Sequence, residues 1–103
     1  MEYIKFFWKY IDEETPVLLF YEVDVDEERY ATRMIEVYKN RTIKKITEEG
    51  VRFITEAPVP TVDEINIDMD FFACTITREE FEELYDSNGK KYNDSIEFPV
   101  KQK

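Results

Sequence analysis

The first half of the chain alternates between apolar and polar positions with a period of two residues. In residues 1–11, one side of the alternation is apolar throughout, and its members are Ile4, Phe6, Trp8 and Tyr10. Successive side chains of a strand point to opposite faces of the sheet. The pattern therefore predicts a strand with one dry face.

A second strand is predicted for the run VLLFYEVDV at residues 17–25. This run begins apolar on both faces and ends with acids on one face. Because of the alternation, we expect Val23 and Val25 to be buried, and Glu22 and Asp24 to face outward. The acids that come next predict an exposed corner, where the chain turns into the following strand.

Two more alternating runs follow, at residues 30–38 and, more briefly, in NRTIKKI at residues 40–46. Short polar turns separate all four runs. Four consecutive strands joined by short turns predict an antiparallel meander.

Beyond Gly50 the pattern changes from strands to helix starts. The Thr-x-x-Glu spacing occurs at Thr61 with Glu64 and again at Thr77 with Glu80. In such a capping box, the Thr side chain accepts from the backbone of the Glu, and the Glu side chain reaches back. We predict a short helix after Thr61 and a second one at about residues 78–86.

A β-prone apolar run, FFACTIT at residues 71–77, adds a fifth strand between the two helices. The chain then divides into a strand-rich part at 1–56, a helix, strand and helix at 61–86, and an extended tail at 87–103. A chain of 103 residues buries roughly 60–70% of its unfolded surface, which is enough for one core. We predict one α+β domain over 1–103, with an antiparallel sheet of four to five strands and one or two short helices on one face.

The charge of the chain limits its partners. Asp and Glu number 24 against 14 Lys and Arg, so the formal net charge is −10. Such a chain repels nucleic acid and anionic lipid, and it attracts basic proteins. Solubility alone also accounts for an acidic surface, so the charge leaves both explanations open.

The expected cellular compartment follows from the lack of a membrane-spanning run and of a signal peptide in the sequence. No apolar run reaches the roughly 18 residues of a membrane span, and the N-terminal ten residues carry charges where a signal peptide is apolar. Cys74 is the one cysteine and has no partner for an internal disulfide. We expect a cytoplasmic protein in which Cys74 is a small buried hydrophobe.

Residues for catalysis and cofactor binding are scarce. The chain has no histidine, which excludes Ser-His and Cys-His catalysis and histidine-dependent zinc sites. Ser87 and Ser95 lack a G-x-S-x-G context, and neither glycine belongs to a phosphate-binding loop. We expect a protein that is not an enzyme and needs no cofactor.

The acids also suggest metal binding, but the spacing is poor. Asp24, Asp26 and Glu28 match positions 1, 3 and 5 of a calcium loop, whereas Arg29 replaces the glycine of position 6 and Ile35 the glutamate of position 12. An EF-hand is therefore excluded. Asp68 and Asp70 could join Asp24 or Asp26 around magnesium, yet nothing in the sequence requires it, and we predict no metal site. Carboxylate-based catalysis stays open as an alternative.

Aromatic residues are frequent in the predicted strands. Stacking platforms for single-stranded nucleic acid lie in basic grooves, and these strands end in acids, so core packing is the favoured interpretation. Tyr3, Tyr30 and Tyr38 fall on the wetter faces, where tyrosine commonly anchors protein interfaces.

The runs PVLLFYEVD, ERYATRMIEVYKN, PVPTVDEIN and FFACTITREEFEELYD together resemble a family of small uncharacterised bacterial domains. The resemblance covers residues 1–86 and is most specific at Pro60–Asn66 and Ile76–Tyr85, which hold caps and a helix stripe but no catalytic residue. The tail from Ser87 departs from the pattern. The resemblance implies an immunity protein of a bacterial toxin system.

Charge and resemblance together predict a non-enzymatic acidic protein that neutralises a basic toxin such as a nuclease, with no direct contact to nucleic acid or membrane. A structural or regulatory interaction domain is the alternative. Two acidic faces are candidates for the partner-binding site. The first comprises Glu22, Asp24, Asp26, Glu27 and Glu28, and the second comprises Asp68, Asp70, Glu79, Glu82 and Glu83.

Overall fold

The fold is an antiparallel sheet with two short helices, in a computed structural model that describes residues 1–9, 15–26, 28–46, 58–87 and 90–98. The elements in chain order are β1 (Glu2–Trp8), β2 (Leu18–Asp24), β3 (Tyr30–Val37), β4 (Ile43–Ile46), α2 (Val62–Ile65), β5 (Phe71–Thr75) and α3 (Arg78–Tyr85). The predicted α+β class and the fifth strand are confirmed. Neither helix of the described part is long and apolar enough to cross a membrane.

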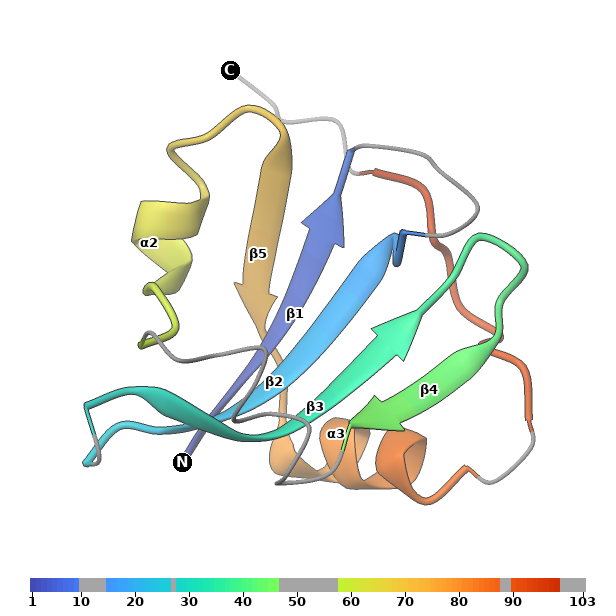
Figure 1. Cartoon of the computed structure of the whole chain (residues 1–103), viewed down its shortest axis with the longest axis horizontal. Coiled ribbons are helices and arrows are strands. Elements are labelled where there is room, and N and C mark those ends of the chain that lie inside the picture. The colour runs from blue at the N-terminus through green and yellow to red at the C-terminus, as the bar shows by residue number, and fades with distance from the viewer. Residues whose placement is uncertain (10–14, 27, 47–57, 88–89, 99–103) are drawn as a thin grey trace.

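The strands lie in the order β4-β3-β2-β1-β5, and every neighbouring pair is antiparallel (Figure 1). The first four strands form the predicted meander. The fifth strand returns to pair with β1, so that Ile4 lies opposite Thr75 and Trp8 lies opposite Phe71. β1 therefore has a neighbouring strand on each side, and β4 and β5 form the two edges of the sheet.

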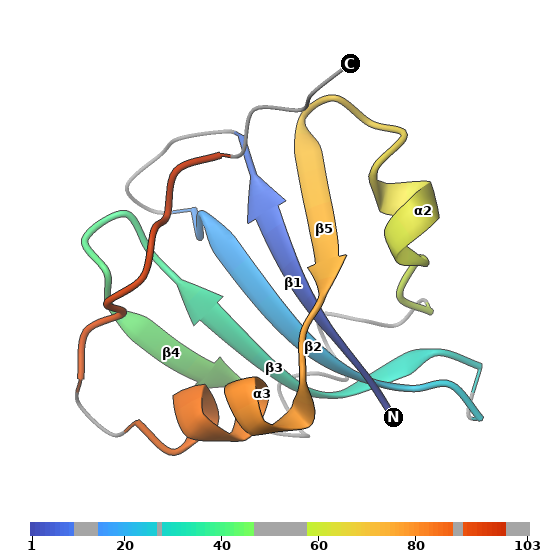
Figure 2. The same cartoon turned by 180° about the vertical axis from the view of Figure 1, so that it is seen from behind.

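Both faces of the sheet are apolar, and each is covered by a different part of the chain. On one face, Tyr3 and Phe7 pack with Phe81 of α3 and with Tyr92 of the C-terminal segment. Figure 2 shows α3 and that segment on the near side of the sheet. On the other face, the buried residues include Ile65 of α2. The sequence predicts that the helices lie on one face of the sheet. This describes the position of α3, whereas Ile65 of α2 belongs to the cluster on the opposite face.

Both helices begin at the predicted caps. The Thr61 hydroxyl accepts a hydrogen bond from the Glu64 backbone at 3.2 Å, and the Glu64 carboxylate accepts from the Thr61 backbone at 3.2 Å. At α3, the Thr77 hydroxyl accepts from the Glu80 backbone at 3.1 Å. These bonds satisfy N–H groups that a helix start leaves without partners.

Two hairpin turns hold the later segments against the sheet through arginines with positive φ. Arg29 (φ 64°) donates from Nε to the Val59 carbonyl at 2.9 Å, and its own carbonyl accepts from the Val59 N–H at 2.8 Å. Arg41 (φ 71°) donates to the Tyr92 and Asp94 carbonyls, and its carbonyl accepts from the Tyr92 N–H. The left-handed conformation is unfavourable for a side chain with a Cβ, and these paired bonds offset its cost.

The outer edge of β5 is capped by a side chain. The Asn66 Oδ1 accepts from the Ala73 N–H at 2.7 Å, and the Asn66 Nδ2 donates to the Ala73 carbonyl at 2.9 Å. The amide thus bonds to Ala73 as a neighbouring strand would. Free strand edges promote pairing between chains, so Asn66 protects this edge.

Replacing Asn66 by alanine should lower the free energy of unfolding by about 1–3 kcal/mol, because the N–H and carbonyl of Ala73 lose their partners. Urea unfolding measures the change. Asn40→Ala is the matched control, since the Asn40 side chain accepts only an exposed bond from the Thr42 N–H. Equal losses in the two variants would contradict the role of Asn66 at the edge.

Candidate functional site

The predicted acidic corner lies at the turn between β2 and β3, and most of it is exposed. Asp26 and Glu28 are exposed, and Asp24 is half-buried, with its Oδ1 accepting from the Asp26 N–H at 3.1 Å. Val25 was expected to be buried but is 46% exposed, because β2 ends at Asp24 and Val25 already belongs to the turn. Glu27 lies outside the described residues.

Glu22 is the clearest correction to the predicted site. Its residue is 7% exposed, and its carboxylate faces the core side of the sheet that α3 covers. Three side chains donate to this carboxylate: the Tyr3 hydroxyl at 2.8 Å, the Thr32 hydroxyl at 2.6 Å, and Arg33 at 3.0 Å from Nε and 2.6 Å from Nη2. Glu22 therefore belongs to the interior and is unsuited to bind a partner.

A bulge in β3 brings two of these donors to one carboxylate. Glu22 pairs with Arg33, whereas the next residue, Val23, pairs with Ala31, so Thr32 is an extra residue in the ladder. A β-bulge places two residues of one strand opposite a single residue of its neighbour. Here both of them, Thr32 and Arg33, bond to Glu22.

The network keeps Glu22 ionised. The hydrogen bonds from Arg33 lower the pKa of Glu22 to about 2, and those from Thr32 and Tyr3 act in the same direction against the effect of burial. The same contact raises the pKa of Arg33. Removing one partner of a buried ion pair leaves an uncompensated charge and strongly destabilises a fold, so this network acts as a structural anchor.

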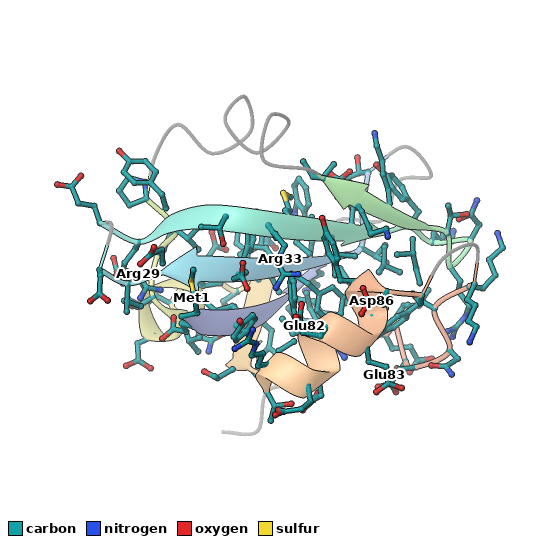
Figure 3. The ribbon with its side chains drawn as sticks, turned by 90° about the horizontal axis from the view of Figure 1, so that it is seen from below. Met1, Arg29, Arg33, Glu82, Glu83 and Asp86 are labelled. Carbon is teal, nitrogen blue, oxygen red and sulfur yellow. The ribbon has the colours of Figure 1, made fainter. Side chains whose placement is uncertain are left out.

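Arg33 extends this anchor to α3. Its Nη1 lies 2.6 Å from the Glu82 Oε1, and its guanidinium carbon lies 5.0 Å from the Phe81 ring centre and 4.7 Å from that of Tyr85. Figure 3 shows Glu82 between the helix and Arg33. The contact holds α3 in one orientation on the sheet and occupies Glu82, which is half-buried.

The remaining acids of α3 and its C-cap are exposed, and we call them the α3 acidic face: Glu79, Glu80, Glu83 and Asp86. Glu80 accepts from the Thr77 hydroxyl, and within the described residues no base pairs with the other three. Figure 3 shows Glu83 on the side of α3 that points away from the sheet.

The position of these acids is unfavourable for the helix itself. The last turn of α3 contains no base, and Glu83 and Asp86 lie at this C-terminal end. Negative charge there opposes the helix dipole, which favours cations at this end by about 0.3–1 kcal/mol each. A local rule broken without a structural gain is a common mark of a functional surface.

A hollow of about 370 Å³ borders the α3 acidic face. Its floor includes Phe20 and Tyr92, and the Lys5 Nζ lies 5.9 and 5.7 Å from their ring centres. Charged residues of both signs form its walls, among them Glu80, Glu83, Asp86, Lys90 and Lys91. The hollow thus joins an apolar floor to the acids of α3.

Cys74 lies beside Lys5 in the β1–β5 ladder and is half-buried. Burial raises the pKa of its thiol, which outweighs the opposite effect of Lys5. A protonated thiol is a poor nucleophile. The position fits the expected packing role better than a reactive one.

The second predicted face is divided in space. Asp68 and Asp70 are exposed in the turn before β5, whereas α3 begins after its other end. The five residues of β5 separate the two groups by roughly 16 Å along the strand. Residues 68–70 and the acids of α3 are therefore two surfaces and not one. No group of three or more Asp, Glu or Cys side chains within the described chain is arranged to hold a metal ion.

The three tyrosines proposed for an interface also differ in position. Tyr3 is 6% exposed and bonds to Glu22, so it belongs to the core. Tyr38 is half-buried and donates to Glu36 at 3.1 Å, while Tyr30 is 37% exposed. The three residues do not form the shared surface that the alternative of a tyrosine-based interaction domain requires.

Two exposed apolar side chains were missed by the sequence reasoning. Ile67 is 82% exposed and Met69 is 78% exposed, next to the acids Asp68 and Asp70. The signal was present in the run INIDMD, where apolar residues alternate with acids directly before a strand.

Comparison with known protein families shows that this chain matches one of them. Residues 2–90 match the model of the family described as "Domain of unknown function (DUF6881)". No curated protein and no solved structure matches the chain. The match covers most of the chain and confirms the expected membership in a family of small uncharacterised domains. This chain is therefore a member of the DUF6881 family.

Proposed function

We propose that this domain is a non-enzymatic acidic binding protein that attaches to a basic protein surface through the α3 acidic face. Its partner would be a basic toxin such as a nuclease, which makes the domain an immunity protein. The main support for this proposal is that Glu83 and Asp86 are exposed and have no basic partner within the described chain. They also lie at the C-terminal end of α3, where acids are unfavourable.

The mechanism follows from charge and rigidity. A nuclease carries a basic groove for its phosphate substrate, and the exposed carboxylates of α3 offer negative charge to such a groove. Long-range attraction raises the association rate of such a pair by roughly 10- to 1000-fold. The Arg33–Glu82 contact fixes α3 before binding, so little ordering entropy is lost on docking.

Reversing Glu83 and Asp86 to lysine together should slow association with a basic partner protein, such as a nuclease recovered with this domain by pull-down, by at least about tenfold at low salt. The same variant should be slightly more stable than the parent, because lysine at a helix C-terminus favours the dipole. Stopped-flow association and thermal unfolding measure the two effects. If the double variant binds more slowly although it is more stable, the slower binding results from a lost docking surface and not from a damaged fold.

The matched control reverses Asp26 and Glu28 at the β2–β3 corner, which changes the net charge by the same amount. If α3 docks, this control should change the association rate much less. Equal slowing by both variants would show that only total charge matters. An unchanged rate in the α3 variant, or a neutral partner whose binding ignores salt between low salt and about 0.5 M, would overturn the proposal and favour a regulatory interaction domain.

A further inference from the structure

Lys5 occupies an unusual place for a lysine, on the apolar sheet face that α3 and the C-terminal segment cover. It belongs to β1 and lies opposite Phe20 of β2 and Cys74 of β5. The side chain is half-buried, and its Nζ lies 4.8 Å from the Phe7 ring centre, 5.9 Å from that of Phe20 and 5.7 Å from that of Tyr92. An ammonium loses hydration in such surroundings, so lysine is rarely placed there without a partner for its charge.

The aromatic rings leave the hydrogen-bonding capacity of this ammonium unused. A lysine head has three N–H donors, and within the described residues no ion pair and no hydrogen bond joins the Lys5 Nζ to an acceptor. In that part of the chain, no fully buried side-chain nitrogen or oxygen lacks a hydrogen bond. The Lys5 Nζ is therefore accessible to solvent, and its donors are open to a ligand.

The Lys5 ammonium is reached through the hollow that borders the α3 acidic face, because Lys5 is one of the residues that line it. The hollow lies between α3 and the C-terminal segment, which Figure 2 shows on the same side of the sheet. Its volume of about 370 Å³ falls within the range of small-molecule sites, roughly 300–1,000 Å³. The apolar side chains that line it with Lys5 include Phe20, Ile43, Ile76 and Leu84.

The charged residues of the hollow differ in exposure. All of them except Lys5 are exposed: Lys90, Lys91, Glu80, Glu83, Asp86 and Asp94. Two bases against four acids give this rim a net charge of −2, which water and salt screen. Lys5 is half-buried among rings, where a lower effective dielectric constant strengthens its attraction for an anion. The hollow therefore offers one strong position for a single negative group, and its rim disfavours a ligand with several.

We propose that this hollow binds a small monocarboxylate with an apolar body. The carboxylate accepts hydrogen bonds from the Lys5 ammonium, and the apolar body lies on Phe20, Ile43 and Leu84. One negative group matches the one half-buried cation, and burial of the apolar body removes the floor of the hollow from water. The site goes beyond the docking function proposed for α3 and does not depend on it.

The test uses 3-phenylpropanoate as the probe and its neutral amide, 3-phenylpropanamide, as the comparison. Both are titrated into the whole chain, and the backbone amide chemical shifts are followed by NMR. We expect saturable shifts centred on the residues that line the hollow, with a Kd of about 1 mM or a few times weaker for a ligand of this size. The amide should bind at least about fivefold more weakly, because it lacks the charge that strengthens the bonds from Lys5.

The carboxylate could belong to a free acid or to the carboxyl end of a peptide, and N-acetyl-L-phenylalanine distinguishes these sources. This compound carries the same charged group on a peptide-like body. If it binds more tightly than 3-phenylpropanoate, the ligand is a peptide end. If it binds more weakly, the ligand is a free acid. Both results require the carboxylate to bind at Lys5.

Replacing Lys5 by methionine keeps most of the apolar length of the side chain and removes its charge. Binding of 3-phenylpropanoate should weaken at least about fivefold. Lys39→Met is the matched control, since Lys39 is an exposed lysine that does not line the hollow, and its binding should equal that of the parent.

Three results would overturn the proposal: shifts that grow without saturation, equal affinity for the acid and the amide, or unchanged binding by Lys5→Met. The comparison of acid and amide uses the unchanged protein and therefore does not depend on the stability of a variant. None of these results affects the α3 proposal, whose readout is association with a whole basic protein.

Discussion

Truncating Phe81 to alanine is expected to destabilise the domain by about 3–5 kcal/mol, the range for a large aromatic removed from a core. Phe81 is fully buried (0% exposed), and its ring centre lies 5.3 Å from that of Tyr3 and 5.9 Å from that of Tyr85. The Arg33 guanidinium also rests on this ring. Removal therefore leaves a cavity between α3 and the sheet and loosens the Arg33 contact.

Urea unfolding followed by far-UV circular dichroism measures the loss. A domain of this size has about 5–15 kcal/mol of stability in total, so Phe81→Leu serves as a milder variant, with an expected loss of about 1–2 kcal/mol. Ile67→Ala is the surface control and should change stability by less than about 0.5 kcal/mol, because Ile67 is 82% exposed. A loss below about 1 kcal/mol in Phe81→Ala would contradict the packing of α3.

Replacing Glu22 by glutamine is expected to cost about 2–4 kcal/mol at neutral pH. The substitution removes the negative charge of the carboxylate to which Arg33, Thr32 and Tyr3 donate hydrogen bonds. A hydrogen bond to a charged group is worth about 1.5–3 kcal/mol. Arg33 keeps its contact with Glu82, which limits the penalty. Glu83→Gln, at an exposed position of α3, is the matched control and should change stability by less than about 0.5 kcal/mol.

The pH dependence of the same residue gives an independent check. The pKa of Glu22 is about 2 in the folded protein against a normal value of 4.5. Because the folded pKa is lowered, the unfolded state binds the proton first, and the stabilisation is complete above about pH 4.5 and is lost as the pH falls toward 2. At neutral pH it amounts to about 3 kcal/mol.

Urea midpoints measured between pH 7 and pH 2.5 test this window. The difference in stability between the parent and Glu22→Gln should be constant above about pH 5 and should shrink steadily below pH 4.5. A difference that stays constant down to pH 2.5 would show that the Glu22 carboxylate is not held ionised by its neighbours.

The secondary structure of this chain was largely predictable because its signals are local. The period-two runs gave the strands, and the two Thr-x-x-Glu spacings marked both helix starts at Thr61 and Thr77, where the bonds to Glu64 and Glu80 occur. Each signal depends on residues within one turn or one strand. Tertiary contacts were not needed to recognise them, and together they were enough for the α+β class.

The candidate sites were predicted less well, because exposure depends on partners far along the chain. Alternation correctly placed Glu22 on the face opposite Val23, but it could not show that this face is covered by α3. A carboxylate on a covered face needs compensating donors, and here they come from Thr32 and Arg33 through a bulge that alternation does not reveal. The same reasoning that found the acid therefore assigned it to the surface.

The sequence by itself determined the strands, the two helix starts with their caps, the net negative charge and the positions of the acids of α3. Only the tertiary structure decided that β5 pairs with β1, which moves residues 68–70 to one end of the sheet and α3 to the other. It also decided that Glu22 and Tyr3 are interior and that the rings of Trp8 and Phe71 pack against each other at one end of the sheet. The physical reason is that propensity and period act over a few residues, whereas burial and charge compensation depend on contacts between strands whose pairing no local pattern specifies.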